Sequence, residues 1–180
     1  MTNTPAPLGK GRMKPTSETT PIAFINGASS FAWAAEELCK SLTPSNRQFS
    51  DPVYLLMAHA IELALKGFLR SKGVPSEALM KRPYGHHLIN LYTKARSLGF
   101  EENTEVCNVV ALLNDSNQNQ ALRYFIVQSR TLPDVGCGVE VTHRLISLAK
   151  SAVLLTDPDA DKPGPLVKFD FTLKVAELPK

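Results

Sequence analysis

Apolar residues recur at steps of three and four positions through most of the chain, a spacing typical of helices that bury one face. It predicts helices over residues 27–42, 51–71, 88–98, 103–113 and 140–155, with a shorter one over 121–128. The stretch 114–120 is polar and is predicted to be a loop. The prolines of this region fall between the periodic segments, as expected for connections. We therefore expect an all-α protein, an up-and-down bundle of four to five helices.

The periodicity also predicts which residues face the core. In the first helix the apolar stripe consists of Phe24, Ala28, Phe31, Ala35, Leu38 and Leu42. The corresponding faces of the helices over 88–98 and 140–155 consist of Leu88, Leu91, Ala95 and Leu98, and of Val141, Leu145, Leu148, Ala149 and Ala152. For the second helix, Asp51 is the predicted N-cap, Pro52 the first helical residue and Gly73 the exit.

The two ends of the chain differ from this helical domain, which covers residues 21–156. Residues 1–20 are rich in Pro, Thr and Ser with few apolar positions, which predicts a disordered tail. Residues 157–180 form a linker and a tail in which Val167–Val175 alternate apolar and polar residues, the pattern of a half-buried β-strand. Its partner is expected to be the same segment of a second subunit or, alternatively, Pro21–Asn26. The other interpretation is a disordered tail with accidental alternation.

Composition narrows the class of protein. A chain of 180 residues with 43% hydrophobic content can bury one core. The net charge of +3 is too small for a strongly basic nucleic-acid domain, so any nucleic-acid surface must be local. Three widely spaced cysteines, Cys39, Cys107 and Cys137, indicate reduced thiols rather than disulfides or a thiolate zinc site. The start of the chain has no signal-peptide pattern. We expect a cytoplasmic protein without membrane association, metal or cofactor.

The second predicted helix carries an isolated polar stripe. Between Val53 and Leu69 the polar residues are His59, Glu62 and Lys66, spaced i, i+3 and i+7 on one face. One interpretation is an exposed Glu62–Lys66 pair with His59 as a satisfied core histidine. The other is that the stripe lines a cleft or a dimer seam, because buried polar groups need partners.

The sequence Gly85-His86-His87-Leu88 opens the third predicted long helix. We expect His86 to face His59 or Glu62 across the bundle; the alternative is an ordinary turn and helix start. Residues 66–96 contain seven basic side chains against Glu77 alone, a local charge of +6. This segment is either a surface that attracts phosphate or a solvated one balanced by the acidic residues that follow it.

A third feature is the pair Arg123-Tyr124. An arginine beside a tyrosine can bind a phosphate and stack on a base. The alternative is a surface arginine and a tyrosine at the edge of the core.

Together these motifs resemble the HEPN (higher eukaryotes and prokaryotes nucleotide-binding) superfamily. The resemblance lies in the run from His59 to Leu69 (HAIELALKGFL), in Gly85-His86-His87-Leu88, and in Arg123-Tyr124, in that order. It implies a helical bundle, usually a homodimer, that binds nucleotides or RNA, in a toxin–antitoxin or phage-defence context with a protein partner encoded nearby. The ligand-binding residues it implies are His59, Glu62, Lys66, His86, Arg123 and Tyr124. His87 stands where the family more often has Asp, Asn or Ser, so a good helix cap is expected to be missing.

Catalysis is a separate question. Ribonucleases of this family resemble one another in an Arg and a His four to six residues apart on a helix. Arg82 and His87 have that spacing, but Pro83 and Gly85 between them predict a loop. The sequence contains no HExxH, P-loop, GxSxG or GxGxxG motif. We therefore expect a binding module rather than an enzyme. The alternatives are a metal-independent ribonuclease using Arg82 with His87 or His86, and a non-catalytic dimerising protein.

Overall fold

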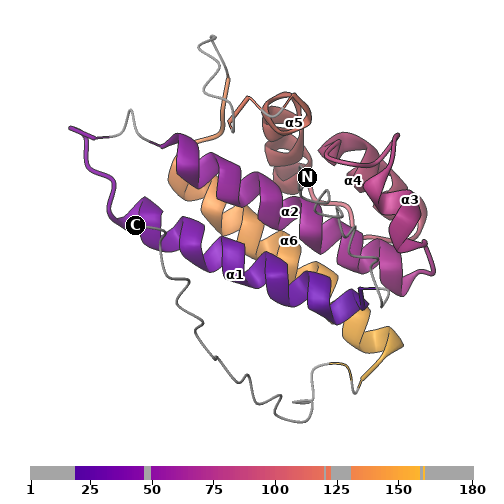
Figure 1. Ribbon diagram of the computed structural model, residues 1–180. Helices are drawn as coiled ribbons and strands as arrows, with labels where there is room; N and C mark the ends of the chain where they lie inside the picture. The colour runs from indigo at the N-terminus through magenta and orange to yellow at the C-terminus, as the bar shows by residue number, and fades with distance from the viewer. Residues whose placement is uncertain (1–18, 47–49, 120, 123–130, 159, 161–180) are drawn as a thin grey trace, which may run out of the picture.

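The computed structural model describes residues 19–46, 50–119, 121–122, 131–158 and 160, which form helices joined by turns (Figure 1). The helices are α1 (Pro21–Lys40), α2 (Asp51–Ser71), α3 (Ser76–Met80), α4 (Leu88–Ser97), α5 (Thr104–Gln118) and α6 (Val135–Thr156). Since the described residues contain no strand, the predicted all-α class is confirmed. Most of the predicted N-terminal tail, most of the short helix over 121–128 and the strand over Val167–Val175 lie outside the described residues and stay predictions.

The long helices α1, α2 and α6 lie side by side, and α4 and α5 pack on α2 as well (Figure 1). Helix α2 therefore has neighbours on several sides, which explains why its sequence is apolar almost all round. By length and composition alone it would qualify as a membrane span, but 72% of its most apolar window is buried inside the bundle. Its apolar surface is thus accounted for by the protein core.

Helix α1 comes unusually close to α2 at a glycine. A Cβ atom placed on Gly67 would lie 2.9 Å from Cδ1 of Ile25 and 3.0 Å from the carbonyl oxygen of Pro21. Any larger residue at this position would push the start of α1 outward. The close contact is one reason that α2 is held in a fixed position.

The predicted start of α1 was wrong, and its predicted apolar stripe was right only in part. The helix begins at Pro21, earlier than expected, because Thr20 caps it by accepting a hydrogen bond from the backbone N–H of Ala23 at 3.3 Å. Ala28 and Ala35 of the predicted stripe are buried as expected, but the buried face also includes Ile25 and Ala32, which the stripe lacked. Small alanines let α1 approach both α2 and α6, whereas the predicted Leu38 is exposed.

The other long helices follow the predictions more closely. Helix α2 has the predicted bounds, although Ser50, and not Asp51, occupies the N-cap position. Gly73 follows it with a φ of 84°, as expected for a residue that ends a helix. Leu88, Leu91 and Ala95 of α4 are fully buried, as are Leu145 and Ala149 of α6. Helix α6 begins earlier than predicted because Asp134 caps it through the N–H of Cys137 at 3.1 Å.

Two further differences concern the side of α2 that faces α4 and α5. The short helix α3 was not predicted. The predicted loop over 114–120 is wrong, since α5 continues to Gln118. Asn114, Ser116 and Asn117 are buried in its last turns. The side chains of Asn114 and Asn117, whose polarity suggested a loop, form hydrogen bonds to neighbouring elements.

Candidate functional site

Glu62 and Lys66 form a buried ion pair in the middle of α2. The Nζ atom of Lys66 lies 2.7 Å from Oε1 of Glu62, and the two side chains are only 8% and 2% exposed. The predicted i,i+4 pair is therefore present, but in the protein interior instead of on the surface. A buried charge needs further hydrogen-bond partners to offset its lost hydration.

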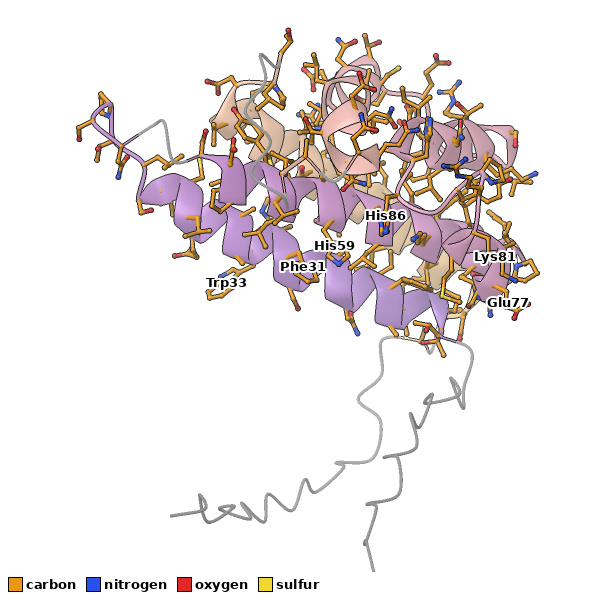
Figure 2. The ribbon with its side chains drawn as sticks, turned by 45° about the horizontal axis from the view of Figure 1, so that its top comes forward. Phe31, Trp33, His59, Glu77, Lys81 and His86 are labelled. Atoms are coloured by element: carbon orange, nitrogen blue, oxygen red, sulfur yellow. The ribbon has the colours of Figure 1, made fainter. Side chains whose placement is uncertain are left out.

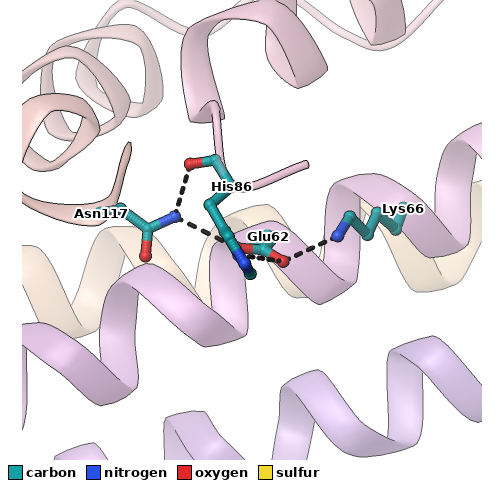
Figure 3. A network of polar contacts seen from close by, with 4 residues as sticks. All are labelled: Glu62, Lys66, His86 and Asn117. Carbon is teal, nitrogen blue, oxygen red and sulfur yellow. Dashed lines mark hydrogen bonds and ion pairs between the residues drawn. The ribbon is translucent and has the colours of Figure 1, made fainter. Parts of the chain in front are cut away.

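His86 supplies one of these partners (Figure 3). Its Nδ1 lies 3.0 Å from Oε2 and 3.3 Å from Oε1 of Glu62. The turn between α3 and α4 brings the imidazole there, and Gly85 adopts a φ of 37° just before it, a conformation that favours glycine. The prediction that His86 faces Glu62 is confirmed.

Asn117, near the end of α5, is the second hydrogen-bond partner of the Glu62 carboxylate. Its side-chain N–H groups donate to Oε2 of Glu62 at 3.1 Å and to the backbone carbonyl of His86 at 2.8 Å (Figure 3). Asn117 thus fixes both the carboxylate and the main chain of the histidine that contacts it. Asn117 was not predicted as a site residue, because the polar stretch around it indicates a loop. The available signal was the spacing of Asn114 and Asn117 by three, which places two amides on one helix face.

The start of α4 is capped by side chains from two elements. The Nδ1 atom of His87 accepts a hydrogen bond from the backbone N–H of Asn90 at 3.3 Å, and Asn114 accepts one from Ile89 at 3.2 Å. The expectation that His87 leaves this helix without a cap is therefore wrong. Together with Asn117, these bonds attach the end of α5 to the segment that carries His86.

The electrostatics of the network favour an ionised Glu62. Burial alone would raise the pKa of this carboxyl group. The Lys66 ammonium, by its charge and its hydrogen bond, and the hydrogen bonds from His86 and Asn117 outweigh burial and lower the pKa below its ordinary value. An ionised carboxylate only accepts hydrogen bonds, so the Nδ1 atom of His86 is the donor in this contact.

His86 also forms part of the wall of a cavity of about 530 Å³ between the α3–α4 turn and the ends of α4 and α5. The lining residues are Met80, Arg82, Pro83, Tyr84, Gly85, His86, His87, Asn90 and Gln118. One edge of the His86 ring contacts Glu62, and the side chain is 40% exposed, so part of it remains accessible. None of these lining residues is acidic. The wall combines an apolar part, formed by Met80, Pro83 and Tyr84, with hydrogen-bond donors.

His59, another predicted site residue, lies elsewhere. The ring of His59 packs edge-on against Phe31 of α1, with ring centroids 4.4 Å apart (Figure 2). The shared site that was predicted from His59, Glu62 and His86 is thus confirmed for the last two residues, while the described ring contact of His59 is with α1. Arg123 and Tyr124 lie outside the described residues.

Arg82 and His87 both line the cavity, and neither lies within a helix. This agrees with the loop that Pro83 and Gly85 between them predicted. Arg82 is an exposed residue of the α3–α4 turn, and His87 is the N-cap of α4. The structure therefore places the two side chains around one cavity, and neither of them lies on a helix.

The basic segment 66–96 does not form one continuous charged surface. Lys66 is buried in its ion pair, Lys72 lies over the ring of Phe68 at 5.4 Å, and Arg96 pairs with Glu102 at 2.5 Å. Lys81 lies 4.0 Å from Glu77. The local charge of +6 is therefore partly neutralised, and Arg82 is the arginine of this segment that lines the cavity beside His86.

Within the described part of the chain, no three His, Cys, Asp or Glu side chains are arranged to hold a metal ion. Comparisons with protein-family models, with curated proteins and with solved structures found no match for this chain.

Proposed function

We propose that this protein is a nucleotide- or RNA-binding module, and that the cavity beside His86 holds a phosphate group of the ligand. The observation that supports this most is the combination of Arg82, His86 and His87 around one cavity whose described lining contains no acidic residue. Guanidinium and imidazole groups are the donors that proteins use for phosphates. The volume of about 530 Å³ lies within the range of small-ligand sites.

The apolar part of the same wall supports a ligand with a base. Tyr84 and Met80 border the cavity next to the donors, and an aromatic face beside a phosphate site can stack on a nucleobase. The resemblance to the HEPN superfamily points in the same direction. In this proposal Glu62 and Lys66 do not touch the ligand, because both are buried; they orient His86 from behind.

The experiment is a binding titration of the full chain with two probes, a short RNA oligomer without terminal phosphates and cyclic AMP. We expect weak binding of at least one probe at low salt. Raising the salt from about 50 mM to about 200 mM should weaken it, because phosphate contacts release counterions. If neither probe binds at low salt, or if binding is indifferent to salt, the proposal is wrong.

One observation favours a second function, a metal-independent ribonuclease. A histidine whose Nδ1 is held by a carboxylate has the orientation that general acid–base catalysis uses, as His86 does at 3.0 Å from Glu62. Incubating RNA with the protein in the presence of a chelator tests this. RNA cleavage by the wild type that is lost in His86→Gln would support the ribonuclease. RNA that stays intact would rule out the ribonuclease and favour the binding module.

A further inference from the structure

The two ring nitrogens of His86 have different roles. Nδ1 donates its hydrogen to the ionised Glu62 carboxylate, which fixes the tautomer of the ring. In the neutral ring Nε2 therefore carries a lone pair and no hydrogen. Because the two nitrogens of an imidazole point in nearly opposite directions, Nε2 points away from Glu62.

A lone pair at Nε2 repels a phosphate oxygen, whereas a protonated Nε2 donates a charge-assisted hydrogen bond to it. Histidine is the side chain that ordinarily gains and loses this proton between about pH 5 and about pH 8. An anion that binds against His86 must therefore bind to the protonated ring, even when the ring of the free protein is neutral.

The other groups around His86 contribute charges that compensate each other or stay fixed, so the proton at Nε2 is the charge that changes with pH. From α2, the charges of Glu62 and Lys66 compensate each other at 2.7 Å. From α5, Asn117 is neutral and donates to the carboxylate. The cavity wall adds the guanidinium of Arg82, a group that is not deprotonated in proteins, and the phenol of Tyr84.

His87 differs from His86 although it is its neighbour in sequence and lines the same cavity. Its Nδ1 accepts the N–H of Asn90 at the start of α4, so this nitrogen carries no hydrogen. The Nε2 of His87 therefore already bears a hydrogen in the neutral ring and can donate without taking up a proton. Protonation of His87 would instead remove the acceptor that caps α4.

We propose that the cavity binds its phosphate ligand together with a proton, which is taken up at Nε2 of His86 and shared with the bound phosphate oxygen. This inference rests on the proposed function. It adds a regulation of the site by pH: the ligand is held in mildly acidic conditions and released as the pH rises, while Glu62, Lys66 and Asn117 keep the ring in place in both states.

The test is isothermal titration calorimetry of the full chain with the RNA oligomer or cyclic AMP, whose phosphodiesters keep one fixed negative charge per phosphate in this range. Each titration is run at several pH values between about 6 and about 8, in two non-phosphate buffers with different heats of ionisation. At the highest pH values we expect an uptake of nearly one proton per bound ligand. In the same part of the range the dissociation constant should rise by up to about tenfold per pH unit.

The structure offers a matched control. His143 also has a carboxylate neighbour, with Nε2 3.1 Å from Glu36, and is 42% exposed, but it lies on α6 and does not line this cavity. His86→Gln should abolish the proton uptake and the pH dependence, and His143→Gln should keep both. Binding without proton uptake, or a pH dependence that survives in His86→Gln, would overturn the inference and leave the proposed function standing. The absence of binding of either probe at any of these pH values would overturn the proposed function itself.

Discussion

The imidazole of His86 and the carboxylate of Glu62 lie 3.0 Å apart although 24 residues separate them in the chain. This contact joins the most buried helix to a surface cavity, because Glu62 is 2% exposed and the His86 side chain is 40% exposed. Glu62 is held in turn by Lys66 and Asn117. The accessible histidine is therefore positioned by groups that a ligand cannot reach.

Replacing Glu62 should destabilise the fold strongly. In Glu62→Gln the ammonium of Lys66 stays buried without a carboxylate partner, so we expect the free energy of unfolding to fall by about 3–5 kcal/mol. The matched control is Glu77→Gln, which removes a carboxylate at the same i,i+4 spacing from Lys81 on an exposed helix (Figure 2). That change should stay within about 0.5 kcal/mol. Urea denaturation measures both; equal losses in the two variants would contradict a buried pair.

Acid should weaken the fold through the same carboxylate. The pKa of Glu62 is lowered from its ordinary value of 4.5 in the folded protein, so the unfolded chain binds this proton more readily. The stabilisation is complete above the unfolded pKa and is lost as the pH falls from about 4.5 through the lower folded pKa. We expect this slope to be shallower in Glu62→Gln and largely kept in Glu36→Gln, since the Glu36 side chain is 38% exposed and solvent screens its ion pairs. A slope that is the same in wild type and Glu62→Gln would rule out this assignment.

The contact between His86 and Glu62 could be predicted because the pattern around Glu62 is unusual. A glutamate within an almost continuous apolar helix needs a polar partner, and the nearby Gly-His turn offers one. His59 was grouped with Glu62 because the two share a helix face. His59 lies one turn, about 4.5 Å along the axis, before Glu62, however, and α2 has different neighbours along its length. At the level of His59 the neighbour is Phe31, and at Glu62 it is the α3–α4 turn.

The spacing of Asn114 and Asn117 indicates a shared helix face, but local pattern could not identify the partners of Asn117, because they lie far away in the sequence. The bond to Glu62 spans 55 residues, and the bond to His86 spans 31. Local composition assigns such asparagines to loops, since exposed asparagines usually compete with helix backbone bonds. The bounds of α2 were predictable for the opposite reason: a long apolar run bounded by Pro52 and Gly73 needs no distant information.

Removing the amide of Asn117 should affect both stability and binding. Asn117→Ala deprives the Glu62 carboxylate of one donor and leaves the carbonyl of His86 without this bond, so we expect a loss of about 1–3 kcal/mol. Asn108→Ala on the exposed side of the same helix is the control and should change little. The pH profile of probe binding separates positioning from a general loss of stability. If Asn117→Ala binds with the wild-type profile while folded, Asn117 does not position His86.

The packing of His59 on Phe31 should contribute to stability and not to binding. Phe31 is half-buried between α1 and α2, whereas Trp33 on the same helix is 63% exposed (Figure 2). We expect Phe31→Ala to cost about 1–3 kcal/mol in thermal or urea unfolding, and Trp33→Ala to stay within about 0.5 kcal/mol. Probe affinity should be unchanged in folded Phe31→Ala. If folded Phe31→Ala bound the probes more weakly than the wild type, His59 and its neighbours would belong to the ligand site after all.

Arg82 should be the side chain whose charge matters most for ligand binding. Arg82→Gln removes a guanidinium from the cavity wall, and we expect the dissociation constant for the RNA oligomer or cyclic AMP to rise by about tenfold. Lys81→Gln removes the same charge from the preceding residue, which is 70% exposed and does not line the cavity. It should reduce binding only slightly, through the weaker overall field. Because both variants lower the net charge equally, a difference between them reports a phosphate contact in the cavity.

The dependence of affinity on salt should also be shallower in Arg82→Gln, as expected when one phosphate contact is lost. Equal effects of the two substitutions would show that binding depends on diffuse charge and that the ligand does not occupy this cavity.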